Sequence, residues 1–194
     1  FIPPLLDKAP DGQPLKAGVV GCGGRGTGAA LNWLGAGPNV TITALGDVFQ
    51  DRIDGCKAKI KADYNVEVAE ENCFVGFDAF QKVIDSGVDV VLLCTPPVFR
   101  AAHFEAAVKA SKHVFMEKPV AVDPAGVRSV LASAKMADSQ GLKVVCGTQR
   151  HHQRDYVEVY KQVATGAIGD IISANADWNQ NKLWHRKPQA DWSE

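Results

Sequence analysis

The sequence lacks the features that mark several classes of protein. No apolar run approaches the roughly 20 residues that a membrane-spanning helix needs, so we expect no membrane partner. The formal net charge of −1 gives no electrostatic reason to expect nucleic acid as a partner. No spacing of His, Cys, Asp or Glu resembles a metal-ligand set, and no Gly-x-Ser-x-Gly turn supplies a nucleophilic serine. We therefore expect neither a metal site nor serine-hydrolase chemistry.

Cysteine is scarce and scattered. The five copies are Cys22, Cys56, Cys73, Cys94 and Cys146. An odd number without paired spacing does not indicate a disulfide framework, and a cysteine in an apolar run usually acts as a small hydrophobic residue. We therefore expect reduced thiols and a cytoplasmic location. Export of the folded protein to the periplasm stays open, because the chain starts at Phe1 and a leader could have been removed upstream.

The chain contains a regular alternation of short apolar runs and amphipathic segments. Residues 1–14 are rich in Pro, Asp and Gly and predict an extended arm. Strands are predicted over residues 15–21, 40–45, 72–75, 88–94, 113–116 and 142–146. Helices are predicted over residues 27–34, 51–62, 78–85, 99–110 and from 124 to about 140. This alternation predicts an α/β fold over residues 15–148, a doubly wound parallel sheet with right-handed crossovers.

The pattern changes after residue 148. Residues 151–165 predict a helix with one apolar stripe, and residues 170–179 alternate like a half-buried strand. A single strand with an exposed apolar face is not stable alone. We therefore predict that residues 149–194 begin a second, α+β domain that is incomplete at Glu194.

One glycine-rich turn follows the first predicted strand. Gly21, Gly23 and Gly26 have G-x-G-x-x-G spacing, between an apolar run and a predicted helix. Such a turn lets backbone N–H groups approach the pyrophosphate of a dinucleotide, with Gly21 permitting the turn and Gly26 the close packing of helix on strand. The three glycines alone are weak evidence, but their place between strand and helix predicts a Rossmann nucleotide site.

An acidic residue strengthens this interpretation. Asp47 lies just after the second predicted strand and about 20 residues after Gly26, where a carboxylate receives the hydroxyls of the adenosine ribose. Because a carboxylate repels a 2′-phosphate, we predict NAD as the cofactor. The nearby Arg52 keeps NADP open as the less favoured alternative, and Asp47 could instead cap the following helix.

Three polar clusters follow predicted strands and should lie at the ligand-binding edge of the sheet. They are Thr95-Pro96-Pro97, Glu117-Lys118-Pro119 and residues 149–152. A partly desolvated lysine beside a positively charged nicotinamide holds its proton less firmly, so Lys118 is the predicted general base for a substrate hydroxyl. Glu117 is predicted to hold Lys118 in place or to bind the cofactor, and Pro119 to form a rigid turn.

These residues together resemble a known family. The segments GCGGRG, TPP and KHVFMEKPVAVD, followed by Gly166-x-x-Gly169-Asp170, are similar to the glucose–fructose oxidoreductase/inositol dehydrogenase/rhizopine catabolism (Gfo/Idh/MocA) family. The resemblance covers the chain from Lys16 onward. It implies a Rossmann domain followed by a larger mixed sheet for substrate binding and oligomer contacts. It also implies NAD or NADP as cofactor, a sugar, polyol or related substrate, and a homo-oligomer in the full-length protein.

The resemblance also assigns roles to residues by position. It places Gly21, Gly23, Arg25 and Gly26 at the pyrophosphate, Asp47 at the adenosine ribose, Thr95 and Pro96 at the nicotinamide half, Glu117 and Lys118 at the reaction centre, and Arg150 and His151 facing the substrate. The run Trp184-His185-Arg186 is similar, with a looser alignment, to a Trp-Arg pair near the cofactor of relatives.

Two departures from the family pattern stand out. The family often has a histidine five residues after the Thr of its Thr-Pro motif, whereas this chain has Arg100 there and His103 one turn later. The family's Asp/His pair, which includes a catalytic histidine, normally lies beyond the position of Glu194. We do not expect His151, His152 or His185 to replace it.

Three functions are therefore open. The leading one is an NAD-dependent dehydrogenase of a sugar or polyol that uses Lys118 as general acid/base. The second is a glycosidase that uses tightly held NAD for a transient oxidation, a chemistry known in some relatives. The third is a non-catalytic binder of cofactor or sugar, because a fold does not fix a function.

Overall fold

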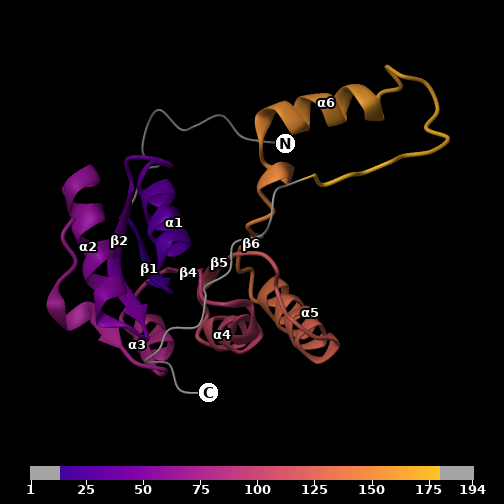
Figure 1. The fold of residues 1–194 in the computed structure, drawn as a ribbon. Coiled ribbons are helices and arrows are strands. Elements are labelled where there is room, and N and C mark those ends of the chain that lie inside the picture. Colours follow the sequence, from indigo (N-terminus) through magenta and orange to yellow (C-terminus); the bar gives the residue numbers. More distant parts are fainter. Residues whose placement is uncertain (1–13, 180–194) are drawn as a thin grey trace, which may run out of the picture. The chain divides into compact units, whose positions relative to one another are not determined.

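The computed structural model describes residues 14–179 and divides the chain into two compact units, Phe1–His152 and Gln153–Glu194. The first unit contains one parallel sheet in the order β3-β2-β1-β4-β5-β6 (Figure 1). This is the strand order of a doubly wound dinucleotide-binding fold, in which the order reverses between β1 and β4. The predicted α/β class and parallel sheet are confirmed.

The elements alternate as strand and helix along the first unit. The strands are β1 (Leu15–Val20), β2 (Val40–Asp47), β3 (Cys73–Val75), β4 (Val90–Leu93), β5 (His113–Met116) and β6 (Val144–Cys146). The helices are α1 (Gly24–Leu34), α2 (Gln50–Tyr64), α3 (Ala79–Asp85), α4 (Pro97–Lys109) and α5 (Pro124–Ser139). Short 3-10 helices are η1 (Glu70–Asn72) and η2 (Gln149–His151). No described helix is both long and apolar enough to cross a bilayer.

Both faces of the sheet bear helices, as the buried residues of β4 show. Val91 and Leu93 belong to a core cluster with side chains of α3, α4 and α5, whereas Val90 and Leu92 belong to another with α1 and α2. Successive side chains of a strand point to opposite faces of its sheet. A strand buried on both faces must be apolar, as all four residues of β4 are, which is why the run from Val88 to Cys94, apolar except for Asp89, is recognisable as a strand.

The second unit corrects one prediction. It contains α6 (Arg154–Ala164), whose described residues are all at least partly exposed, and residues 171–179 have no regular secondary structure. The strand predicted over residues 170–179 is therefore wrong for this chain. A strand forms only when it pairs with another, and the described part of this unit supplies no second strand. The helix predicted over 151–165 begins three residues later, after η2.

Close packing of β1 against α1 depends on glycine. A Cβ atom on Gly26 would lie 1.7 Å from the carbonyl oxygen of Gly21, a distance that no side chain can occupy. Gly24, two residues earlier on the same helix, is exposed, and a Cβ atom there would meet no other atom within 4 Å. Gly26 is therefore required for close packing, whereas Gly24, on the same helix, is not.

Gly26→Ala should destabilise the domain by about 3 kcal/mol or more, because the Gly21 backbone cannot yield as a flexible side chain would. The shift in the urea midpoint of unfolding measures this loss. Gly24→Ala is the matched control and should leave stability unchanged or slightly raised, since alanine favours the helix. Equal effects of the two variants would contradict a packing role for Gly26.

Helix α4 carries a buried histidine. His103 is 8% exposed and stacks on Phe80, with ring centroids 4.1 Å apart, and on Phe99 at 5.9 Å. Burial, and to a smaller extent the positive charge of Arg100, lowers the pKa of His103 from 6.5 to about 4. The folded protein therefore holds this imidazole neutral at pH values where an unfolded chain would protonate it.

The free energy of unfolding should consequently fall as the pH drops from 6.5 to 4. Between these pH values His103 is protonated in the unfolded chain but neutral in the folded chain. The stability that this difference contributes is therefore present above pH 6.5 and is lost toward pH 4. The loss can reach about 3 kcal/mol. Denaturant titrations at several pH values measure it, and His103→Phe keeps an aromatic ring that cannot titrate. A pH slope in His103→Phe equal to that of the wild type would contradict the assignment.

Candidate functional site

A row of backbone hydrogen bonds runs along the carboxyl edge of the sheet. Four backbone N–H groups each donate to a carbonyl of the neighbouring strand at 2.8–3.0 Å. The pairs, with the donor first, are Gly21 to Gly46, Cys94 to Val20, Glu117 to Leu93 and Gly147 to Met116. Each donor is the first residue after its strand, so the segments that follow β1, β4, β5 and β6 leave the sheet side by side. The polar clusters predicted at strand ends do therefore share one edge.

A cavity of about 350 Å³ opens at this edge, at the point where the strand order reverses. Five residues predicted to bind cofactor line it: Gly21, Gly23, Asp47, Thr95 and Pro96. Arg52, which kept NADP open as the alternative, also lines it, and further lining residues that were not predicted include Phe49, Phe77, Phe99 and His103. Ligands of open α/β sheets bind in this position, outside the carboxyl ends of the strands.

The glycine turn is shaped as the motif requires. Gly21 has φ +91°, and a Cβ atom there would lie 2.7 Å from the backbone nitrogen of Thr95. Only glycine combines a positive φ with so close an approach of backbone. Gly23, by contrast, faces open space, with nothing within 4 Å of a Cβ position. The turn is therefore closed on the side of the sheet and open at Gly23, where a ligand would approach.

The amino end of α1 suits an anion. Its N-cap is Gly23, which has no side chain, and the first turn carries no acidic residue. The first N–H groups of a helix have no acceptor within the helix, and the helix dipole favours negative charge at that end. The residues present therefore fit the pyrophosphate of a dinucleotide by donor chemistry as well as by space.

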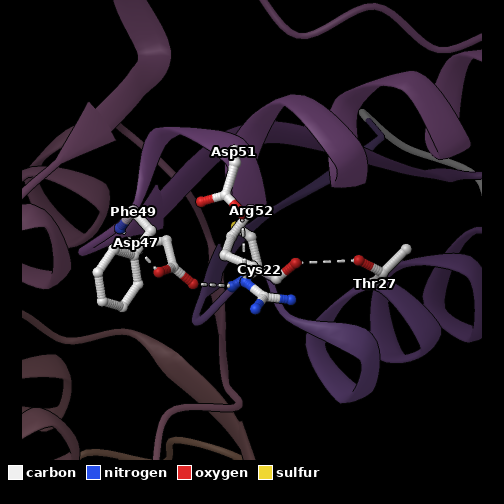
Figure 2. A network of polar contacts seen from close by, with 6 residues as sticks. All are labelled: Cys22, Thr27, Asp47, Phe49, Asp51 and Arg52. Atoms are coloured by element: carbon white, nitrogen blue, oxygen red, sulfur yellow. Dashed lines mark hydrogen bonds and ion pairs between the residues drawn. The ribbon is translucent and has the colours of Figure 1, made fainter. Parts of the chain in front are cut away.

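Asp47 connects the strand end to the glycine turn (Figure 2). One oxygen of its carboxylate accepts a hydrogen bond from the backbone N–H of Cys22 at 2.7 Å, and the other from that of Phe49 at 3.0 Å. Phe49 is the N-cap of α2, and no side chain caps that helix. The carboxylate thus braces the turn before α2 and lies against the glycine loop, on the wall of the cavity.

Two residues predicted around the cofactor form a pair with each other. Arg25 Nε donates to Glu117 Oε1 at 2.7 Å, where the Glu117 carboxylate is buried and the Arg25 side chain is half-exposed. Neither residue lines the cavity. Glu117 is predicted to hold Lys118 in place or to bind the cofactor, and in the structure the partner of its carboxylate is Arg25.

Lys118 stands at the end of β5, one strand beyond the cavity. Its side chain is exposed, and within residues 14–179 it makes no hydrogen bond or ion pair. The peptide bond to Pro119 is cis, as the turn predicted there allowed. Within the described part of the chain, the ammonium group is therefore accessible to a substrate.

A glycine that sequence reasoning missed makes room for the Glu117 carboxylate. A Cβ atom on Gly147 would lie 2.9 Å from Glu117 Oε1. Gly147 has no motif around it, and only its place after β6, beside the end of β5, reveals the role. Arg150 and His151 follow on η2, are exposed, and do not line the cavity. Trp184, His185 and Arg186 lie outside the described residues.

The pKa values of two thiols near the site, Cys94 and Cys22, are raised. Burial, with a smaller contribution from Glu117, raises the pKa of the Cys94 thiol to about 12. A hydrogen bond with Cys56, together with burial, also raises the pKa of Cys22. Since the thiolate is the reactive form, both are poor candidates for covalent chemistry. Within residues 14–179 no three His, Cys, Asp or Glu side chains gather in a way that could hold a metal ion.

Comparison with known proteins agrees with this geometry. A myo-inositol 2-dehydrogenase of Thermotoga maritima is 31% identical over 155 residues, which are 80% of this chain and 42% of that protein. A glycosyl hydrolase family 109 protein of Streptomyces coelicolor is 22% identical over 92% of this chain and 40% of its own length. The chain thus spans less than half the length of these relatives.

A solved structure shares the fold. The scyllo-inositol dehydrogenase of Lactobacillus casei, with bound NAD(H) and scyllo-inositol, superposes with a TM-score of 0.67 at 26% identity. The match covers 81% of this chain and 43% of that one. Residues 15–163 also match the sequence profile of the oxidoreductase family with an NAD-binding Rossmann fold. The chain therefore belongs to the Gfo/Idh/MocA oxidoreductase family, whose NAD-binding domain forms its first unit.

Proposed function

We propose that the protein containing this chain is an NAD-dependent oxidoreductase that acts on a hydroxyl-bearing carbon of a sugar, polyol or related small molecule. One observation carries the proposal: the glycine turn, Asp47 and Thr95 converge on one cavity at the reversal point of the sheet. The names of the relatives, which are inositol dehydrogenases among others, support the substrate class. A homo-oligomer of the full-length protein remains part of the proposal.

Each part of the site has a separate task in this proposal. The open turn at Gly23 and the uncapped amino end of α1 bind the pyrophosphate, and Asp47 accepts the ribose hydroxyls. Thr95 and Pro96 border the nicotinamide half, next to the end of β5. When bound, the nicotinamide supplies the acceptor or donor of hydride.

Lys118 supplies the proton transfer. Its Nζ atom accepts the proton of the substrate hydroxyl during oxidation and returns it during reduction. The exposed side chain, which has no hydrogen-bond or ion-pair partner among residues 14–179, supports this role. Glu117 contributes indirectly, because its pair with Arg25 anchors the segment that carries Lys118. Arg150 and His151 are proposed substrate contacts on the strength of the family pattern alone.

A second function is favoured by one comparison. The relative from Streptomyces coelicolor, a glycosyl hydrolase family 109 protein, matches over 92% of this chain. We infer as an alternative that the protein is a glycosidase in which a tightly held NAD would supply a transient oxidation of the substrate. The two functions separate in one assay, since a dehydrogenase accumulates NADH whereas the glycosidase releases sugar without net NADH.

The first test of either function is cofactor content. Denaturing the purified protein and measuring released nucleotide, followed by titration of the stripped protein with NADH and NADPH, shows whether the cavity binds a dinucleotide. We expect about one NAD per chain or a clear preference for NADH. If the folded protein binds neither nucleotide, both the dehydrogenase and the glycosidase are ruled out, and a non-catalytic module is left.

Asp47→Asn should shift the cofactor preference toward NADPH. The amide oxygen can still accept one backbone hydrogen bond, whereas the charge that repels a 2′-phosphate is gone. The ratio of the NADPH to the NADH dissociation constant should fall by about tenfold. Nucleotide fluorescence titration measures both constants. Asp54→Asn removes a nearby charge that does not line the cavity and should leave the ratio unchanged. An equally large shift in this control would show that the loss of net charge, not the position of Asp47, changes the preference.

Lys118→Ala should lower turnover by about 10²–10⁴-fold, the usual contribution of a general acid/base. The dissociation constant of NADH should change little, because the lysine acts on the substrate. Steady-state rates with NAD and a panel of inositols and hexoses give the first value, and fluorescence titration gives the second. Lys112→Ala, at the opposite end of β5, is the control. Undiminished turnover in Lys118→Ala would remove the lysine from the mechanism.

A further inference from the structure

Arg100 is the largest fully buried side chain of the described chain. It lies in the first turns of α4 and is 2% exposed. Arginine is almost never fully buried without a charged partner. Among residues 14–179, no carboxylate forms an ion pair with it, and its Nε has no hydrogen-bond partner. The side chain therefore needs an explanation other than a salt bridge.

The two terminal nitrogens of Arg100 bind backbone carbonyls from two different strand ends. Nη1 donates to the carbonyl of Pro119, and Nη2 donates to the carbonyl of Thr95. Thr95 follows β4 and lines the cavity, whereas Pro119 is joined to Lys118 after β5. One rigid group thus links the proposed nicotinamide border to the segment that carries the proposed base.

Packing alone does not account for a charge at this position. Burial lowers the pKa of Arg100 from its usual range, and nearby Cys94 and Glu117 oppose that shift. The guanidinium nevertheless stays ionised, and an ion held mainly by carbonyls costs more to bury than an apolar side chain of similar volume. A cost of this kind is usual at functional sites, where geometry matters more than stability.

We propose that Arg100 is a positioning residue that ties the Thr95 and Pro119 carbonyls together and thereby fixes Lys118 relative to the nicotinamide end of the site. This inference rests on the proposed function, because it presumes a dinucleotide in the cavity and a base at Lys118. The planar guanidinium has two donors at a fixed spacing, which a lysine ammonium on its flexible stem does not reproduce.

The test compares two ligands in the wild-type protein and in Arg100→Lys and Arg100→Met. NADH reaches both halves of the site, whereas ADP-ribose lacks the nicotinamide. The dissociation constant of NADH should rise by about tenfold in both variants. That of ADP-ribose should stay within about twofold. A merely structural role would weaken both ligands alike, and urea midpoints show whether each variant is folded.

Turnover supplies a second readout. If Arg100 acts through Lys118, Arg100→Lys should lower kcat in the wild-type background and have little further effect in Lys118→Ala. Equal effects in both backgrounds would overturn the positioning role, as would an unchanged ratio of the two dissociation constants. If Arg100→Met does not fold, Arg100→Lys decides the question, because it keeps the charge and most of the volume.

The binding data distinguish a wrong proposed function from a wrong role for Arg100. A folded wild-type protein that binds neither NADH nor ADP-ribose overturns the proposed function, and the role of Arg100 with it. A wild type that binds both ligands, with an NADH to ADP-ribose ratio that Arg100→Lys does not change, overturns the role of Arg100 alone.

Discussion

The site depends on the row of backbone hydrogen bonds at the carboxyl edge of the sheet. Because Gly21, Cys94 and Glu117 each bond to the adjacent strand directly after their own strand ends, three loops start from one line. Any side chain at position 21, even the single Cβ of alanine, would hold these loops apart where Gly21 meets Thr95. The cavity, the position of Asp47 and the exit of Lys118 all follow from that alignment.

Charge at the site is arranged in two separate parts. Asp47 faces the cavity with hydrogen bonds only from backbone, so its carboxylate remains able to accept further donors. On the other side, Arg25 and Glu117 neutralise each other, and Arg100 is held by carbonyls. The cavity wall thus carries the Asp47 carboxylate, whereas the segment after β5 is held by one ion pair and one buried guanidinium.

Sequence predicted the parts of this molecule that depend on local pattern. The strands of the first unit, their alternation with helices and the turn at Gly21 follow from periodicity and from glycine spacing. It could not reveal that Arg25 turns to Glu117, or that Gly147 makes room for that carboxylate, because these contacts join residues far apart in the chain. The strand predicted after residue 169 failed because alternation shows only how a segment could pair, not whether a partner exists.

The cavity is lined by residues that are far apart in the sequence, and this affects how quickly the protein is degraded. The cavity wall runs in sequence from Val20 to His103 and includes the segments that follow β1, β2, β3 and β4. A ligand that contacts all of these segments binds only the folded domain, so at 100 times its dissociation constant it adds about 2.7 kcal/mol against unfolding. Proteases that cut the transiently opened chain would then degrade the empty form faster, and the supply of dinucleotide would influence the abundance of the protein.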